Sequence, residues 1–405
     1  MEFYQSYKAK YHFSLNFYSL FLLITFIPDF IGLPASLFTN GIWLIRAVMG
    51  FWLIHKFKKK IFILNWGEKL FLFVTFVYFL NIAIDVFLQN YPIDLGSPID
   101  LIGFFLCVLV AFSFRYEDSF STKSSYYFFL FTLALGLLIA FFVAIPSPPP
   151  LIGRFDANST VNTINYGKMG CSMAIVAIYG YKNYKFKFSL LIYPLLVLLG
   201  IVSIMRSGSR SPVVVLLLVV VFYVLSDYSF LKGLFIVFCS FLILWFSIGV
   251  IIQLSEMIES DIVTRLLASI ESGDSSGRDG IYLNVLGKIK DSPIFGSFYL
   301  ISSGIGKGSY PHNYFLEVFM TTGLIGGIPF IVMALLSLIK CFQLLRYKHA
   351  AGWIILLFLQ SFFYGMFSSN LFSAEDFWGL CFLVLSIDLI TARNNFKVNN
   401  KVKII

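Results

Sequence analysis

Long apolar runs recur along almost the whole chain and leave little sequence for a domain outside a membrane. An α-helical bilayer crossing needs about 20 mostly apolar residues, and twelve segments approach that length between clusters of charge, proline or glycine. Only 13% of the 405 residues are charged, about half the share found in an ordinary soluble domain. The apolar runs lie near residues 13–30, 36–54, 68–90, 99–114, 126–145, 166–181, 188–205, 212–226, 230–252, 313–339, 351–367 and 374–392. The sequence therefore predicts an all-α polytopic membrane protein with about twelve transmembrane helices, in which residues 1–405 form a single integral membrane domain.

The basic residues predict how this bundle is oriented. With the N-terminus inside, most of the 30 Lys and Arg residues fall on loops that share the cytoplasmic side, as the positive-inside rule expects. Both termini are then cytoplasmic, and the net charge of +9 requires no nucleic acid to explain it. The first apolar run lacks a small-residue cleavage site and is followed at once by more membrane segments, so it predicts an anchor and not a signal peptide.

Several basic residues break this rule on the outer side. Arg206 and Arg210 flank an outer turn that leads straight into an apolar helix, whose N-terminus therefore faces outward. Free backbone N–H groups beside two guanidiniums suit a phosphate or pyrophosphate group. The alternative is that both arginines extend to lipid headgroups.

One outer loop, roughly residues 253–312, is long enough to fold over a site as a lid. It carries Arg278, a second candidate for binding phosphate, after a stretch rich in Gly, Ser and Asp that predicts a partly flexible segment. An amphipathic helix on the membrane surface is predicted to follow, and its apolar residues are Tyr282, Val285, Leu286 and Ile289.

His312 is the only one of the four histidines predicted to lie outside. A neutral imidazole can accept a proton near pH 7, so His312 is a candidate general base. Glu317 lies one helical turn beyond Asn313 and is a second candidate, although it could instead hold Asn313 or a lid arginine in place. Gly323 and Gly326 could simply allow close helix packing.

Other charged residues are expected within the membrane or at its outer boundary, where they are costly unless they are paired or line water. They are Arg46, Asp85, Arg154, Lys168 and Asp388. No DxD motif and no His/Cys cluster has the spacing of metal ligands, so we expect neither a metal nor another cofactor.

Three motifs, taken in order, resemble the superfamily of O-antigen ligases and Wzy-type O-antigen polymerases. The first is Ser207-Gly-Ser-Arg210 before an apolar helix, and the second is the outer loop with Arg278 and Ser292-Pro-Ile-Phe-Gly296. The third is His312-Asn-x9-Gly-x-x-Gly326. The resemblance covers roughly residues 200–330 in motif and the whole chain in topology. The paired Arg-x10-Gly loops described for some polymerases are absent from this sequence.

The resemblance implies a metal-independent glycosyltransferase of the GT-C type in the bacterial inner membrane, with its active site on the periplasmic face. Its donor would be an oligosaccharide on undecaprenyl pyrophosphate, and its partners would be the lipid bilayer and a protein that regulates chain length. Arg210, Arg206 and Arg278 would bind the pyrophosphate, while His312 or Glu317 would act as base. The secondary candidates are Asn313, Lys168, Arg154 and Arg46.

The acceptor decides between the functions that the resemblance leaves open. A polymerase joins lipid-linked repeat units, and a ligase transfers the glycan to lipid A core. The short, phenylalanine-rich chain with its compact lid favours a polymerase. A flippase could also have twelve spans, but it predicts symmetry-related halves and helices broken near the midplane, and the sequence shows neither.

Overall fold

The computed structural model describes residues 64–87, 98–113, 123–148, 153–158, 161–271 and 277–402. The first two predicted spans, 13–30 and 36–54, and the candidate Arg46 lie outside the described residues. The described helices are α4 (Trp66–Phe87), α5 (Pro98–Ser113), α7 (Lys123–Val143), α8 (Thr163–Asn183), α9 (Ser189–Ser207), α10 (Arg210–Asp227), α11 (Phe230–Phe246), α12 (Ile248–Met257), α13 (Ile262–Glu271), α14 (Arg278–Asp291), α15 (Tyr314–Arg346), α16 (Gly352–Tyr364), α17 (Glu375–Ser386) and α18 (Leu389–Val402). A short antiparallel hairpin joins β1 (Ile145–Pro146) to β2 (Phe155–Asp156).

The helices confirm a mostly helical membrane fold. Five helices, α4, α7, α9, α10 and α15, are long and apolar enough to cross a bilayer, and α11 with α12 adds a sixth if the bent pair is counted as one span. The predicted runs from residue 68 onward fall on described helices, although the run 230–252 is divided between α11 and α12, the run 374–392 extends past α17 into α18, and α16 is shorter than its run. The count of twelve spans remains a prediction.

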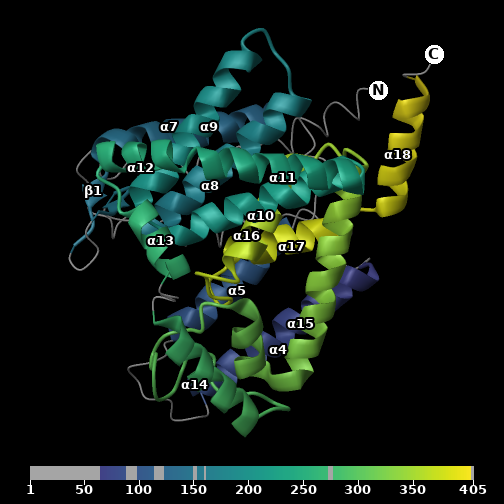
Figure 1. Cartoon of the computed structure of the whole chain (residues 1–405). Helices are drawn as coiled ribbons and strands as arrows, with labels where there is room; N and C mark the ends of the chain where they lie inside the picture. The colour runs from purple at the N-terminus through teal and green to yellow at the C-terminus, as the bar shows by residue number, and fades with distance from the viewer. Residues whose placement is uncertain are drawn as a thin grey trace.

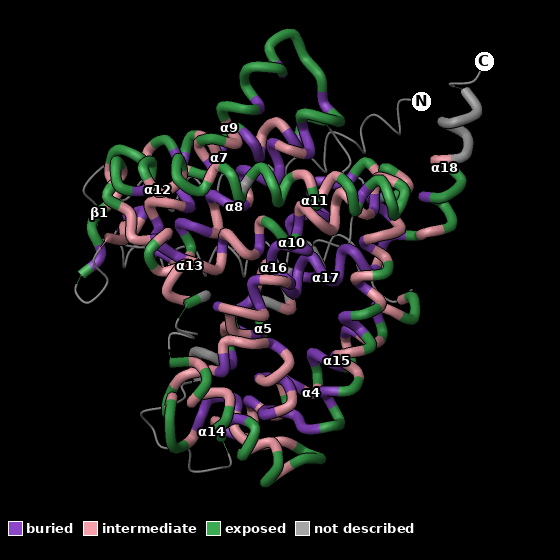
Figure 2. Tube along the Cα trace, in the orientation of Figure 1, coloured by how far each residue is buried: buried purple, intermediate pink, exposed green. Residues whose placement is uncertain are grey.

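The core lies where α8, α16 and α17 meet. Figure 1 shows α7 to α13 gathered in the upper part and α4, α14 and α15 in the lower part, with α16 and α17 between them. In Figure 2, α16 and α17 are mostly buried, whereas much of α11 is exposed. Trp353 and Trp378 have no exposed surface, while Phe235 and Phe238 of α11 are well exposed. An exposed apolar helix is expected where lipid, not water, is the solvent.

Helix α15 is broken at Gly323, where the backbone leaves helical geometry. The neighbouring segment 292–297 contacts the broken helix, because Leu324 N donates to Pro293 O at 2.8 Å and Ser297 N donates to Met320 O at 2.6 Å. Backbone groups freed by the break thus find partners, as the interior of a membrane requires. No local pattern in the sequence predicts this break, because it depends on a segment more than twenty residues away in the sequence. The two glycine motifs, 292–296 and 323–326, are parts of one packed element.

Gly296 should tolerate no side chain at this contact. Its φ of +81° lies in the left-handed region, and a Cβ would overlap the carbonyl of Thr321. We expect Gly296→Ala to lower the free energy of unfolding by more than about 2 kcal/mol, measured as thermal or denaturant unfolding in detergent. The matched control is Gly287→Ala within α14, where no atom lies within 4 Å of the new Cβ. That variant should gain about 0.5–1 kcal/mol, and equal effects at the two glycines would contradict the contact.

Candidate active site

Four arginines from separate parts of the chain line a cavity of about 260 Å³. This volume is close to the lower end of ligand pockets, which begin at about 300 Å³. Arg210 begins α10, Arg265 lies in α13, Arg278 begins α14 and Arg154 precedes β2. The other lining residues are Ile164, Ser209, Ser211, Val214, Leu266, Ser269, Phe367 and Ser368.

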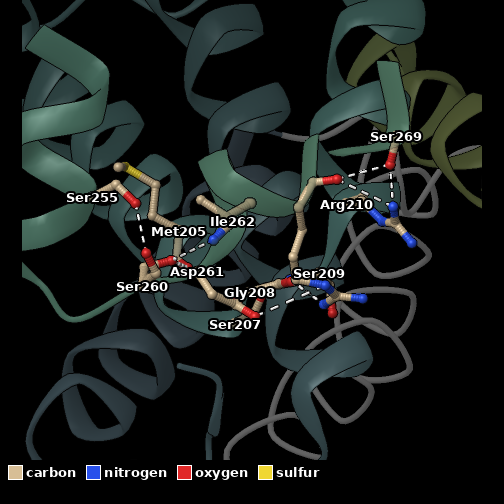
Figure 3. Close-up of polar contacts among 11 residues, drawn as sticks. Met205, Ser207, Gly208, Ser209, Arg210, Ser255, Ser260, Asp261, Ile262 and Ser269 are labelled. Carbon is tan, nitrogen blue, oxygen red and sulfur yellow. Dashed lines mark hydrogen bonds and ion pairs between the residues drawn. The ribbon is translucent and has the colours of Figure 1, made fainter. Parts of the chain in front are cut away.

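The turn between α9 and α10 gathers these groups. α9 is capped by Gly208, whose φ of +58° is left-handed and where an added Cβ would overlap Arg154 and Asp261. Arg265 Nη1 donates to the Gly208 carbonyl at 2.7 Å. A side chain at residue 208 would push α13 and Arg154 away, so the glycine of the Ser-Gly-Ser-Arg motif allows the close approach. Figure 3 shows this turn with Arg210 and Ser269 beside it.

Polar contacts hold the guanidiniums around the cavity. Arg210 Nη1 donates to the hydroxyl of Ser269 and to the Arg265 carbonyl, the latter at 3.2 Å (Figure 3). On the other side, Arg278 Nη2 donates to Ser368 Oγ at 3.3 Å, and Ser368 bonds the hydroxyl of Ser211 on α10. α10, α13 and α14 are therefore tied together through the cavity wall and through the loop between α16 and α17.

The cavity is strongly cationic. Its lining contains four arginines and no carboxylate, and Asp261 lies just behind it, with Oδ2 3.9 Å from Arg265 Nε. Burial and, secondarily, the charge of Arg210 lower the pKa of Arg278. The same two causes lower the pKa of Arg154, although the nearby carboxylate of Asp261 acts in the opposite direction. Guanidinium groups are not deprotonated in proteins, so the lining carries positive charge. A multiply charged anion would relieve the repulsion, and planar guanidiniums suit phosphate oxygens.

His312 lies next to this cluster, although it is not part of the lining. Its φ of +59° is uncommon for a residue with a side chain, and its ring packs 4.3 Å from the Tyr310 ring, measured between centroids. Burial and, secondarily, the charge of Arg278 lower the pKa of His312 to about 4. Within the part of the chain that the structure describes, its buried Nδ1 has no hydrogen-bond partner. The imidazole is thus neutral at pH 7 and lies within the electrostatic influence of Arg278.

Part of the chain that carries this arrangement matches a known family model. Residues 195–331 match the family model described as O-antigen ligase. The match covers about a third of the chain and includes three of the four cavity arginines and His312. It confirms the resemblance inferred from the three motifs. A comparison with curated proteins finds no match for the chain.

Asn313 has a structural role at the start of α15, within the segment that matches the family model. Its Oδ1 accepts from the backbone N–H groups of Phe315 and Leu316 at 3.0 and 3.2 Å, and its Nδ2 donates to the Met366 carbonyl at 3.3 Å. It is therefore an N-cap. By capping α15 it fixes the backbone that follows His312 and joins it to the loop after α16.

Glu317 lies inside the protein and is not part of the cavity lining. It has no exposed surface, and its Oε1 accepts from Tyr78 OH at 2.6 Å and from Leu371 N at 2.9 Å. Leu371 belongs to the loop that also carries Ser368 and Phe372. Phe372 packs against the ring of Tyr310, the neighbour of His312. Through this loop, Glu317 can position both Ser368, which lines the cavity, and Tyr310, which packs against His312.

Arg206 is separated from the other arginines. Its guanidinium lies over the rings of Phe141 and Phe155, at 5.1 and 4.7 Å from the centroids, and Nη1 donates to the Phe141 carbonyl. Arg206 is the last but one residue of α9 and Arg210 the first of α10, so the turn at Gly208 directs them to different neighbours. The structure brings Arg154, Arg210 and Arg278 together but leaves Arg206 outside the lining.

The remaining charged candidates that the structure describes each contact a partner away from the cavity. Lys168 Nζ pairs with Asp376 Oδ2 at 2.6 Å, and Asp85 Oδ2 accepts from Tyr299 N at 2.8 Å. Asp388 caps the start of α18, where Ile390 N donates to its Oδ1 at 3.0 Å. These contacts stabilise helix packing and the loop before α15. The described residues contain no cluster of three or more metal-ligating side chains, and the absence of a metal remains a prediction.

Sequence reasoning missed Arg265, Ser269 and Ser368. Arg265 and Ser269 lie one helical turn apart in α13, while Ile262 of the same helix is buried. Their spacing is a signal that amphipathic analysis of the loop could have found. Ser368 follows α16 without any motif, so only the structure reveals it.

Glu317 offers a test that separates positioning from proton transfer. We expect Glu317→Gln to keep most activity, because the amide oxygen can accept the same two hydrogen bonds. Glu317→Ala should lose about 1–3 kcal/mol of stability by leaving buried donors unpaired, and Tyr78→Phe should be milder. Glycan transfer in vesicles and the unfolding midpoint in detergent are the measurements. Loss of transfer by Glu317→Gln with unchanged stability would instead identify a base.

Proposed function

We propose that this protein is an O-antigen, or surface polysaccharide, polymerase that joins repeat units carried on undecaprenyl pyrophosphate. The proposal rests mainly on one observation, the cavity of four arginines beside a neutral histidine within an O-antigen ligase domain. A membrane glycosyltransferase of this family needs such a site, because it must hold a pyrophosphate and deprotonate a sugar hydroxyl. In this scheme, neither the binding of the pyrophosphate nor the deprotonation of the hydroxyl requires a bound metal.

The chemistry assigns a task to each group. The acceptor oxygen attacks the anomeric carbon of the donor, and the bond from that carbon to the pyrophosphate oxygen breaks. Negative charge then grows on the departing polyprenyl pyrophosphate, where Arg210, Arg278, Arg265 and Arg154 stabilise it more than in the ground state. His312 takes the proton of the attacking hydroxyl. Attack opposite the leaving group would invert the anomeric carbon.

The orientation belongs to the same proposal. Twelve spans in a GT-C arrangement, both termini in the cytoplasm and a periplasmic site would put the protein in the bacterial inner membrane. The supporting observation is that the exposed surface of α9, α10, α11 and the end of α15 is largely apolar. A protein that regulates chain length would bind from the periplasmic side.

The second candidate function is an O-antigen ligase, which the description of the matching family favours. The two enzymes use the same donor chemistry and differ in acceptor, so the arginine cavity and His312 support both equally. The polymerase is preferred because the chain is short and its outer loop compact.

A glycan gel from a deletion strain separates these functions. Loss of a polymerase should leave lipid A core with a single repeat unit, whereas loss of a ligase should leave unsubstituted core and accumulated lipid-linked polymer. Unaltered surface polysaccharide would contradict both and favour a transport role. Plasmid-borne wild-type protein should restore the original ladder.

The pKa of His312 predicts an unusual pH profile. A base must be deprotonated, so kcat/KM should fall only as the pH drops through about 4, the pKa in the free protein. An ordinary histidine would lose activity below about 6.5. A bound pyrophosphate offsets the charge of Arg278 and should move the corresponding fall in kcat to higher pH. Initial rates with lipid-linked donor from about pH 5 to 8 test this, and a fall of kcat/KM near pH 6.5 would contradict it.

A further inference from the structure

α14 has two apolar faces, and only one of them is covered. Val285 is fully buried with Ile301 and Met320 of α15, and Ile289 packs against the same cluster. The predicted surface face was therefore wrong for Val285 and Ile289, because this side of the helix packs against the protein. The outward side carries Leu283 and Leu286, which are 72% and 51% exposed.

The exposed apolar surface continues beyond the end of α14. Ile294 and Phe295 are 53% and 69% exposed. They adjoin Pro293, whose carbonyl accepts from Leu324 N, the first residue after the break in α15. The segment therefore lies beside the start of residues 324–346 of α15.

Residues 324–346 follow the break in α15, a helix that is long and apolar enough to cross a bilayer. At about 1.5 Å a residue they are long enough for a hydrocarbon core of about 30 Å. Leu324, Ile328, Leu335 and Ile339 form an exposed apolar stripe along one side of this helix. We expect such a stripe to face lipid, and Leu324 lies at the end of it that is nearest to residues 293–295. Ile294 and Phe295 are therefore expected at the level where hydrocarbon meets headgroups.

We propose that α14 and residues 293–295 dock on the bilayer, with Leu283, Leu286, Ile294 and Phe295 inserted at the boundary between headgroups and acyl chains. This surface continues the lipid-facing stripe of α15, which favours lipid over a second protein as its occupant. Lys290, seven residues after Leu283 on the same side and exposed, can reach the phosphate groups of lipids. Docking fixes the depth of α14, whose first residue, Arg278, lines the cavity.

Photocrosslinking in the full-length protein tests this contact. Leu283→p-benzoylphenylalanine and Phe295→p-benzoylphenylalanine place the probe on the proposed surface, and the second replaces one aromatic ring by another. Ser303→p-benzoylphenylalanine is the control, because Ser303 is exposed on the flank where Lys288 Nζ donates to its hydroxyl at 2.9 Å. Each protein is irradiated in nanodiscs of phosphatidylethanolamine and phosphatidylglycerol, and intact mass spectrometry measures phospholipid adducts.

We expect phospholipid adducts at 283 and 295 in yields several-fold above that at 303. A crosslink to a second copy of the chain, or no adduct above the control, would overturn the proposal. The abundance of the Phe295→p-benzoylphenylalanine protein in the membrane is measured as well. An abundance equal to that of the wild type means that a missing adduct is not due to misfolding. The readout needs no glycan transfer, so it stands or fails independently of the proposed function.

Discussion

His312→Ala should abolish glycan extension while leaving the amount of protein in the membrane unchanged. Loss of a positioned base typically costs about 10²–10⁴-fold in rate, and no other described imidazole lies beside the arginine cavity. The Nδ1 of this side chain has no hydrogen-bond partner among the described residues, so its removal should cost little stability. The measurement is the length of the glycan ladder in cells, followed by initial rates in reconstituted vesicles.

His349→Ala is the matched control. His349 follows α15 at its other end, where its Nδ1 accepts from Ala351 N at 3.2 Å. This variant should keep transfer near the wild-type rate. A His312→Ala protein that extends glycans normally would remove the histidine from the mechanism and leave the base unidentified.

Arg210→Lys should reduce transfer on the order of 10²-fold, the usual cost of removing one group that stabilises developing charge. Lysine keeps the positive charge but cannot reproduce the planar fork that meets two phosphate oxygens. The loss should appear mainly in kcat, because charge on the leaving group is greatest in the transition state. Initial rates with a lipid-linked donor give the value, and unfolding in detergent checks that the ties to Ser269 and α13 survive.

Arg206→Lys provides the comparison within the same motif. Arg206 lies only four residues away but packs over Phe141 and Phe155, so this variant should transfer glycan almost normally. Equal losses at the two positions would mean that the anion does not bind in the cavity. The affinity for inorganic pyrophosphate, measured by calorimetry, should also fall in the Arg210→Lys protein and stay unchanged in the Arg206→Lys protein.

The chain's amino acids by themselves determined the helices and the place of the motifs. Apolar length and charge are local properties, so the predicted runs from residue 68 onward agree with the described helices. The three motifs likewise fall within residues 195–331, the segment that matches the family model described as O-antigen ligase. Arg210 and Arg278 could be chosen because each begins a helix, and His312 because it lies in the loop just before α15. At such places, position along the chain nearly fixes position in space.

Only the tertiary structure decided which candidates meet. The left-handed turn at Gly208 sends Arg210 into the cavity and leaves Arg206 on aromatic rings, although both belong to one motif. The side chain of Glu317 accepts a hydrogen bond from Tyr78, 239 positions earlier in the sequence, because α4 packs against α15. Arg265 entered the site because α13 folds back on that same turn. Side-chain direction at a helix end depends on packing with distant segments, and no local pattern in the sequence records that packing.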